Sequence, residues 1–226
     1  MVALSRIQPA MPHGSEHFIP RRSDQPASDL PRIHLASTSP RRRELLAAAG
    51  IEFDAAHPGL DDGQLAPGSI DPERWVMALA YLKAASALHT KSVPGACIIL
   101  GADTIVVQDG RTFGQPTDAA DARRMLVAMR NADHDVLTGV ALIDPRTGAR
   151  EIFADRAIVH VGHISDDEIE RYIASDLWRG KAGAYNLSER LAAGWPITFE
   201  GDPGTIMGLP MRMLPDRLRA FASRAA

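Results

Sequence analysis

The chain has 226 residues but only one cysteine, Cys97, and its eight histidines contain no HExxH motif. A single cysteine excludes an intrachain disulfide and any metal cluster built on several thiolates. Without the histidine motif, no zinc hydrolase site is expected. Cys97 itself lies in the apolar run Ala96 to Leu100, so we expect a buried small side chain rather than a nucleophile.

The sequence also lacks a long apolar run and an excess of positive charge. No apolar run approaches the roughly 20 residues that a membrane-spanning helix needs, and the formal net charge is −3. We therefore expect neither a membrane nor a nucleic acid as partner. Hydrophobic residues make up 45% and charged residues 23% of the chain, which is typical of a globular protein with an ample core.

The first thirty residues differ from the rest. Met1 to Leu30 mix Pro, His, Ser and Asp without apolar periodicity, and they contain no apolar segment typical of a secretory signal. We interpret residues 1–31 as a flexible N-terminal extension and residues 32–226 as one domain. A cytoplasmic location is expected.

Lysine is scarce, because the chain has only Lys83, Lys91 and Lys181 beside many arginines. Where arginine is the usual cation, a lysine indicates a position that needs a compact ammonium group. The environments of these three side chains are therefore of interest.

The most informative segment runs from Leu35 to Leu46 and reads LASTSPRRRELL. An apolar strand, Ile33 to Ala36, leads into small hydroxyl residues, after which Ser39 fits a helix N-cap and Pro40 the first helical position. Arginines then fill the first turn, although a helix N-terminus already carries about half a positive charge. An anion bound there would explain them, since N–H, hydroxyl and guanidinium groups together suit a phosphate chain. The alternative is a plain helix start with solvated arginines.

Apolar periodicity and turn signals predict alternating helices and strands. Strands are expected at Ile33–Ala36, Glu52–Ala55, Ala96–Leu100, Ile105–Gln108, Arg111–Phe113, Val136–Asp144 and Arg150–Val161. Helices are expected at Pro40–Ala49, Pro72–His89 and Asp118–Arg130, from the capping box at Ser165 to about Ser175, and from Pro215 onward. Thr117 would cap one helix, Ser165 and Glu168 would form a capping box, and Trp178 to Pro210 would be a loop. This order predicts an α/β fold, a mixed twisted sheet flanked by helices, with a cleft.

Lys83 falls within the apolar stripe that is predicted for the long helix. That stripe is formed by Trp75, Leu79, Leu82 and Ser86. A lysine among such residues either extends its ammonium group into solvent or meets an anion.

Asp103 follows the buried strand Cys97 to Leu100 and two small residues. A carboxylate at the end of a core strand is where α/β folds place functional sites. Asp103 could therefore bind Mg²⁺ or activate a water molecule. The alternative is an Asx-turn cap before the following hairpin.

Five strings stand in a fixed order along the chain: Leu35–Leu46, Leu79–Ala84, Gly101–Val107, His134–Leu142 and Lys181–Tyr185. Together they resemble the motifs of the Maf family of nucleoside triphosphate pyrophosphatases, also called septum formation proteins. The resemblance covers Ile33 to about Leu214. It implies two lobes around a nucleotide-binding cleft, in which a nucleoside triphosphate is hydrolysed to a nucleoside monophosphate and pyrophosphate.

The resemblance also implies roles for individual residues. Arg41 and Arg42 would hold the phosphates, and Lys83 would pair with phosphate. Asp103 would accept a proton or act through water and a divalent metal cation (Mg²⁺, Mn²⁺ or Co²⁺), for which Asp62 is a second candidate ligand. The expected substrate-binding residues are Ser37, Ser39, Thr104, Gln115, Lys181 and Ser188. By family analogy alone, a homodimer is suggested.

Two positions depart from the family pattern. Gln115 stands where the family usually has lysine, and Ser188 replaces a glutamine that contributes to substrate choice. Losing a catalytic lysine can cost a few kcal/mol, or a factor of about 10²–10³ in rate. Lys181 is a candidate to compensate, and Glu189 adds a carboxylate nearby.

Two functions follow from these observations. The first is an active pyrophosphatase that hydrolyses non-standard or modified nucleotides with altered base selectivity. The second is a nucleotide-binding regulator, linked to cell division, that has lost turnover. Retention of Arg41, Arg42, Lys83 and Asp103 favours the enzyme.

Overall fold

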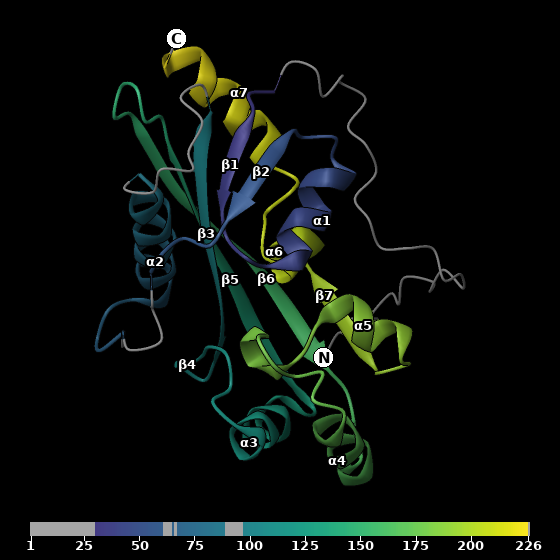
Figure 1. Ribbon diagram of the computed structural model, residues 1–226. Coiled ribbons are helices and arrows are strands. Elements are labelled where there is room, and N and C mark those ends of the chain that lie inside the picture. The colour runs from purple at the N-terminus through teal and green to yellow at the C-terminus, as the bar shows by residue number, and fades with distance from the viewer. Residues whose placement is uncertain (1–29, 61–64, 66, 89–96, 226) are drawn as a thin grey trace, which may run out of the picture.

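The computed structural model describes residues 30–60, 65, 67–88 and 97–225, so all but the last two positions of the predicted extension, residues 1–31, lie outside the described residues. The described residues form a seven-stranded mixed sheet flanked by helices (Figure 1), which confirms the predicted α/β fold. The strands are β1 (Ile33–Ala36), β2 (Phe53–Ala56), β3 (Ile98–Gln108), β4 (Arg111–Phe113), β5 (Ala132–Ile143), β6 (Arg150–Val161) and β7 (Ile197–Glu200). The helices are α1 (Pro40–Ala48), α2 (Pro72–Ala87), α3 (Ala119–Met129), α4 (Asp166–Ala174), the 3₁₀ turn η2 (Ala182–Ala184), α5 (Leu187–Ala192), α6 (Pro203–Met207) and α7 (Leu214–Ala225).

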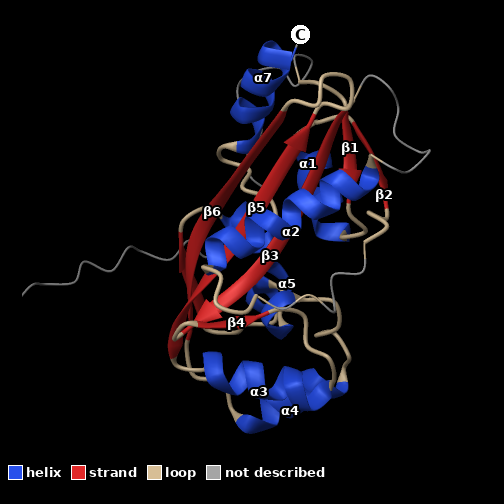
Figure 2. Ribbon diagram, turned by 90° about the vertical axis from the view of Figure 1, so that its left-hand side faces the viewer, coloured by secondary structure: helices blue, strands red, loops and turns tan. Residues whose placement is uncertain are grey.

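The sheet has the order β2-β1-β3-β5-β6-β7, with β4 paired to β3. β1 runs parallel to β2 and β3, whereas the other pairs are antiparallel. The three longest strands, β3, β5 and β6, have 11, 12 and 12 residues. In Figure 2 they run from the end of the molecule near α7 toward the end near α3 and α4, so they connect its two halves.

β3 continues through the segment where the sequence predicted a strand end. It passes without interruption from Ile98 to Gln108, and Asp103 pairs with Gly139 of β5 in the middle of the ladder. The expectation that Asp103 follows the end of a core strand is therefore wrong, and so is an Asx-turn cap. The small residues before Asp103 do not break the strand, because their amide groups still pair with β5.

Those small residues instead allow α2 to lie very close to the sheet. A Cβ atom on Gly101 would be 2.3 Å from the carbonyl oxygen of Ala80, and one on Gly139 would be 2.4 Å from that of Val76. Both distances are far below van der Waals contact, so only glycine fits at these positions. The close approach brings the middle of α2 over the middle of β3.

The buried face of α2 is offset from the predicted stripe. Leu79 is buried as expected, but Leu82 is 38% exposed, and small side chains form the contact with the sheet. The buried residues of α2 are Val76, Leu79, Ala80, Ala84 and Ala87. A helix pressed onto glycines packs through small side chains, which a pattern of large apolar residues does not indicate.

The two largest hydrophobic clusters of the described residues lie in different halves of the molecule. In the first, α1 and α7 cover the face of the sheet opposite α2, through side chains such as Leu46 and Leu218 (Figure 1). In the second, α3, α4 and the chain around Trp178 and Trp195 pack on the far ends of β3, β5 and β6. Each core forms one lobe, as the family resemblance implied.

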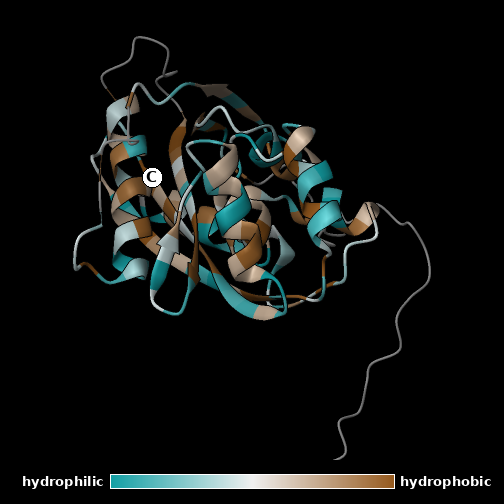
Figure 3. Cartoon of the chain, turned by 90° about the horizontal axis from the view of Figure 1, so that it is seen from below, coloured by the Kyte–Doolittle hydropathy of each residue, from teal (hydrophilic) through white to brown (hydrophobic). Residues whose placement is uncertain are grey.

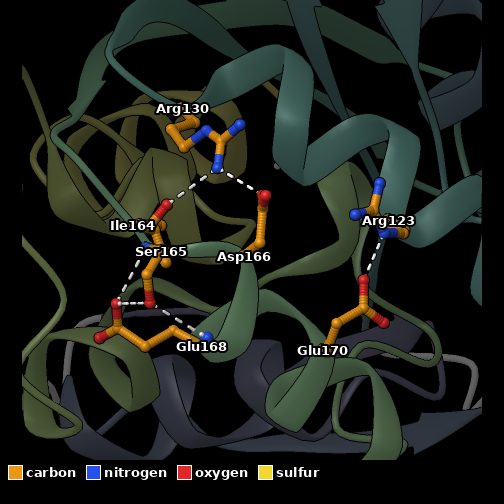
Figure 4. Close-up of polar contacts among 7 residues, drawn as sticks. All are labelled: Arg123, Arg130, Ile164, Ser165, Asp166, Glu168 and Glu170. Atoms are coloured by element: carbon orange, nitrogen blue, oxygen red, sulfur yellow. Dashed lines mark hydrogen bonds and ion pairs between the residues drawn. The ribbon is translucent and has the colours of Figure 1, made fainter.

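The start of α4 confirms the predicted capping box (Figure 4). The amide of Glu168 donates to Ser165 Oγ at 3.3 Å, and the amide of Ser165 donates to Glu168 Oε2 at 2.9 Å. Arg130 also donates to the carbonyl of Ile164 at 3.1 Å and to Asp166 Oδ1 at 2.7 Å. These bonds fix the start of α4 against the end of α3.

The helices carry hydrophobic and hydrophilic residues on different faces (Figure 3). On α4, Ile169 and Tyr172 are buried whereas Asp167 and Glu170 are exposed. Within the described ranges, no helix is both long and apolar enough to cross a membrane.

Two further elements differ from the sequence prediction. Asp118, not Thr117, is the N-cap of α3, and its Oδ1 accepts from the amide of Asp121 at 2.8 Å. The segment predicted as a loop between Trp178 and Pro210 contains η2, α5, β7 and α6. These elements have three to six residues each, so tertiary contacts rather than local periodicity stabilise them.

Candidate active site

A cavity of about 710 Å³ is lined by residues of both lobes. Its lining includes every described residue that the sequence predicted for the site: Ser37, Ser39, Arg41, Arg42, Lys83, Asp103, Thr104, Gln115, Lys181 and Ser188. The remaining candidate, Asp62, lies outside the described residues. Residues spread over some 150 positions of the sequence thus meet at one hollow.

Arg42 is a buried residue in the lining of this cavity. It is only 9% exposed. Its guanidinium donates to the carbonyl of Gly208 at 2.9 Å, to Ser37 Oγ at 3.1 Å and to Thr104 Oγ1 at 3.2 Å. These acceptors belong to the end of α6, the loop after β1, and β3. Arg42 therefore joins three segments that are distant in sequence.

Gly208 is required at its position for two reasons. Its φ is +110°, a left-handed conformation that side chains strongly disfavour. A Cβ atom there would also lie 3.1 Å from Arg42 Nε. The same region is tied to β5, because Thr138 Oγ1 lies 2.9 Å from Thr104 Oγ1 and donates to the carbonyl of Thr205 at 2.7 Å.

Arg41 differs from its neighbour because its guanidinium forms no hydrogen bond or ion pair with the part of the chain that the structure describes. Burial lowers the pKa of Arg41, and the charges of Glu189 and Glu44 oppose that shift. Ser39 occupies the N-cap position of α1 as predicted, but its side chain makes no capping bond. The first turn of α1 thus offers an uncommitted cation and backbone N–H groups to an anion.

Lys83 meets an anion, which decides between the two alternatives left open by the sequence. Its Nζ donates to Asp103 Oδ1 at 2.6 Å. The two side chains are 14% and 12% exposed. The pair joins α2 to the middle of β3 at the place where Gly101 and Gly139 allow the closest approach.

A second lysine–carboxylate pair lies in the same cavity. Lys181 Nζ donates to Glu189 Oε2, and both residues line the cavity. The Lys181 side chain is 9% exposed and that of Glu189 is 41% exposed. Burial lowers the pKa of Lys181, while its bond to Glu189 partly restores it.

The helix that carries Glu189 is fixed at both ends. At its start, Asn186 Oδ1 accepts from the amide of Glu189 at 3.0 Å and from Ser188 Oγ at 2.7 Å. At its end, the guanidinium of Arg190 lies 4.3 Å from the ring centre of Tyr172 and 5.2 Å from that of Trp195. Cation–π contacts of this kind hold the buried arginine in place.

Gln115 and Ser188, which depart from the family pattern, have different surroundings in the cavity. Gln115 is exposed at the cavity and follows Gly114, whose carbonyl accepts from the amide of Gly183 at 3.0 Å. Ser188 uses its hydroxyl for the cap of α5. Neither residue places a positive charge in the cavity, whereas Lys181 does.

Several lining residues were not predicted. His57 and Leu60 come from the loop after β2, Glu44 from the second turn of α1, and Met207 from α6. His57 Nδ1 accepts from the amide of Gly59 at 2.9 Å. No sequence signal predicted them, because each lies outside the five family-like strings or, like Glu44, occupies an ordinary helix position.

The described residues supply a candidate ligand for a divalent cation. Among the described residues no three His, Cys, Asp or Glu side chains are grouped as a metal site. Asp103 nevertheless offers a carboxylate in the cavity. Mg²⁺ is commonly held by one or two carboxylates together with substrate phosphates.

Comparison with known proteins identifies the family. The family model of Maf-like proteins matches residues 32–221. A dTTP/UTP pyrophosphatase of Geotalea uraniireducens (strain Rf4) is 40% identical over 191 residues, which cover 84% of this chain and 95% of that protein. One of Pelotomaculum thermopropionicum is 36% identical over 192 residues, covering 85% and 97%. One of Burkholderia pseudomallei (strain 1710b) is 36% identical over 202 residues, covering 86% and 95%. The chain therefore belongs to the Maf family of nucleoside triphosphate pyrophosphatases, hydrolases that act on acid anhydrides.

Proposed function

We propose that the cavity binds a nucleoside triphosphate and hydrolyses the bond between its α- and β-phosphates. The observation that carries this proposal is that the Lys83–Asp103 pair lines the same cavity as Arg41, whose guanidinium has no partner in the described ranges. A carboxylate that can take a proton thus shares a hollow with cations that can bind phosphate oxygens. The products would be a nucleoside monophosphate and pyrophosphate.

In this proposal the chain's own residues move one proton and bind the phosphates. A water oxygen bonds to the α-phosphorus, its proton passes to a carboxylate oxygen of Asp103, and the bond to the bridging oxygen of pyrophosphate breaks. Lys83 holds the carboxylate in position and balances charge. Arg41 and the first turn of α1 bind phosphate oxygens, while Arg42 keeps Ser37 and Thr104 in place. Such displacement depends on positioning and charge stabilisation and needs no covalent nucleophile.

Asp103 would hold a divalent cation together with phosphate oxygens, and Asp62 is the second candidate ligand. When bound, the cation neutralises charge on the phosphates.

For the substrate, we propose pyrimidine nucleotides with a 2,4-dioxo ring. The three relatives above are named dTTP/UTP pyrophosphatases, which supports UTP and dTTP as the first candidates. The non-standard or modified nucleotides expected from the sequence fit the same proposal where they keep that ring, as in triphosphates of 5-substituted uracils.

Pyrophosphate release tests the proposal across UTP, dTTP, CTP, ATP, GTP and 5-substituted uridine triphosphates, each with Mg²⁺, Mn²⁺ or Co²⁺. Turnover that is highest for the uracil and thymine nucleotides supports it. Equal rates for all bases would contradict the proposed substrate class but would still support the proposed reaction.

The absence of a cation at Gln115 favours a second candidate, the non-catalytic nucleotide-binding regulator. Calorimetric titration of UTP in the same buffers separates the two. Binding without pyrophosphate release under any of the three metals would support the regulator and overturn the enzyme.

A further inference from the structure

Two lysines of this arginine-rich chain each pair with a carboxylate in one cavity. The Lys83–Asp103 pair has a place in the proposed reaction, whereas the Lys181–Glu189 pair has none so far. Both partners of the second pair line the cavity. Glu189 is an acidic residue in a cavity that several cations line, and no step of the proposed reaction uses it.

The location of Glu189 places a negative charge among the cations that would bind phosphate. Its carboxylate accepts from the buried ammonium group of Lys181. Its charge also acts on Arg41, where it supports the charged form and opposes the pKa shift caused by burial. Glu189 is thus the ion-pair partner of Lys181 and, without pairing with Arg41, favours the charged form of that residue as well.

The backbone of Glu189 is fixed by its neighbours, whereas the end of its side chain is partly exposed. Asn186 caps its amide and the guanidinium of Arg190 lies against the rings of Tyr172 and Trp195, so α5 is fixed. The side chain itself is 41% exposed, which leaves room for the carboxylate to turn toward solvent. A phosphate entering the cavity would be repelled by this charge unless the carboxylate moved.

We propose that Glu189 is an affinity-determining residue, whose carboxylate competes with the phosphates of the ligand for Lys181. On binding, the hydrogen bond from Lys181 to Glu189 breaks, Lys181 donates to a phosphate oxygen, and Glu189 turns to solvent. When pyrophosphate leaves, the internal pair forms again. The exchange makes or breaks no covalent bond. It weakens the binding of substrate and pyrophosphate alike and assists product release. This inference rests on the proposed function for the identity of the ligand.

Glu189→Gln tests the competition directly, because it removes the charge and keeps the size of the side chain. Calorimetric titration uses inorganic pyrophosphate and the non-hydrolysable α,β-imido analogue of UTP, at one ionic strength. We expect the variant to bind both ligands roughly tenfold more tightly, as released Lys181 becomes available for a charge-assisted bond. Unchanged or weaker binding of both ligands would overturn the proposal.

A matched control and a double variant separate competition from general repulsion. Glu170→Gln removes the partner of a surface ion pair with Arg123 outside the cavity, and it should leave both affinities unchanged. Lys181→Met should weaken binding, and in that background Glu189→Gln should change affinity less than twofold. If the gain persists without Lys181, competition for Lys181 is wrong. Thermal unfolding confirms that each variant is folded, and Lys181→Gln replaces Lys181→Met if the latter is not.

These titrations do not depend on turnover. The variants could show the expected affinities although the protein hydrolyses no triphosphate. That result would overturn the proposed function and retain the role of Glu189.

Discussion

Lys83 Nζ lies 2.6 Å from Asp103 Oδ1, and this bond joins the middle of α2 to the middle of β3. The two elements meet so closely because Gly101 and Gly139 leave no side chain between the helix and the sheet. The packing of small residues therefore determines the geometry of the pair. In turn, the pair places a charged carboxylate in a cavity that is otherwise rich in cations.

Asp103→Asn should abolish hydrolysis and keep the fold. The amide oxygen of asparagine can still accept from Lys83, but it cannot take a proton from water. Loss of a general base typically lowers the rate by about 10²–10⁴, which steady-state kinetics at saturating metal can measure. Asp133→Asn is the matched control, because Asp133 is 71% exposed and pairs with His160 outside the cavity. Near wild-type turnover of Asp103→Asn would remove Asp103 from the mechanism.

Arg41→Ala and Arg42→Ala should differ in stability although both weaken triphosphate binding. Each lost charged hydrogen bond should cost about 1.5–3 kcal/mol of binding free energy. Arg42→Ala should also lower the melting temperature, because Ser37, Thr104 and the carbonyl of Gly208 lose their donor. Titration with the non-hydrolysable analogue and thermal unfolding measure the two effects. Unchanged affinity of both variants would show that neither arginine binds the phosphates.

Gln115→Lys tests whether this chain lacks a charge that its family usually has. If the cavity is otherwise complete, the new ammonium group should raise kcat and reduce the dependence on Mg²⁺. If Lys181 or the metal already supplies that charge, the new cation would repel the metal and lower activity. Measuring kcat and KM at several Mg²⁺ concentrations separates these cases. A loss that grows at low Mg²⁺ would show that Gln115 is no handicap.

His134 should make stability depend on pH below neutrality. Its Nε2 lies 2.8 Å from the hydroxyl of Tyr185, and burial lowers the pKa of His134 to about 4 from the usual 6.5. Above pH 6.5 the imidazole is neutral in both states, and the full stability is present. Between pH 6.5 and 4 only the unfolded chain gains the proton, so the free energy of unfolding should fall by roughly 3 kcal/mol.

Urea unfolding of the wild type and His134→Gln from pH 7.5 to 4 isolates this contribution, since other groups add the same slope to both proteins. Glutamine does not titrate and can still bond to Tyr185. The variant should therefore lose less stability than the wild type over this range. Parallel curves would show that His134 does not cause the dependence.

Local signals in the sequence predicted where several helices begin. Pro40 after Ser39 marks the start of α1 within one residue, and Ser165 with Glu168 marks that of α4. Such signals succeed because capping and backbone geometry act between residues that are close in sequence. They also place Arg41 and Arg42 on the same first turn of a helix.

The parts that the sequence did not predict depend on contacts between distant residues. Asp103 lies inside a strand because β5 continues to pair with it, opposite Gly139. Arg42 differs from Arg41 because it donates to the carbonyl of Gly208, which is 166 positions away in the sequence. α5 is too short for a periodic pattern, so the position of Glu189 follows from the packing of Arg190.

Hydrolysis of UTP in ¹⁸O-labelled water shows which phosphorus atom the water attacks. Attack on the α-phosphorus should place one labelled oxygen in the phosphate of UMP and leave pyrophosphate unlabelled, both of which mass spectrometry detects. Labelled pyrophosphate, release of orthophosphate with UDP, or no turnover with any of the three metals would contradict it.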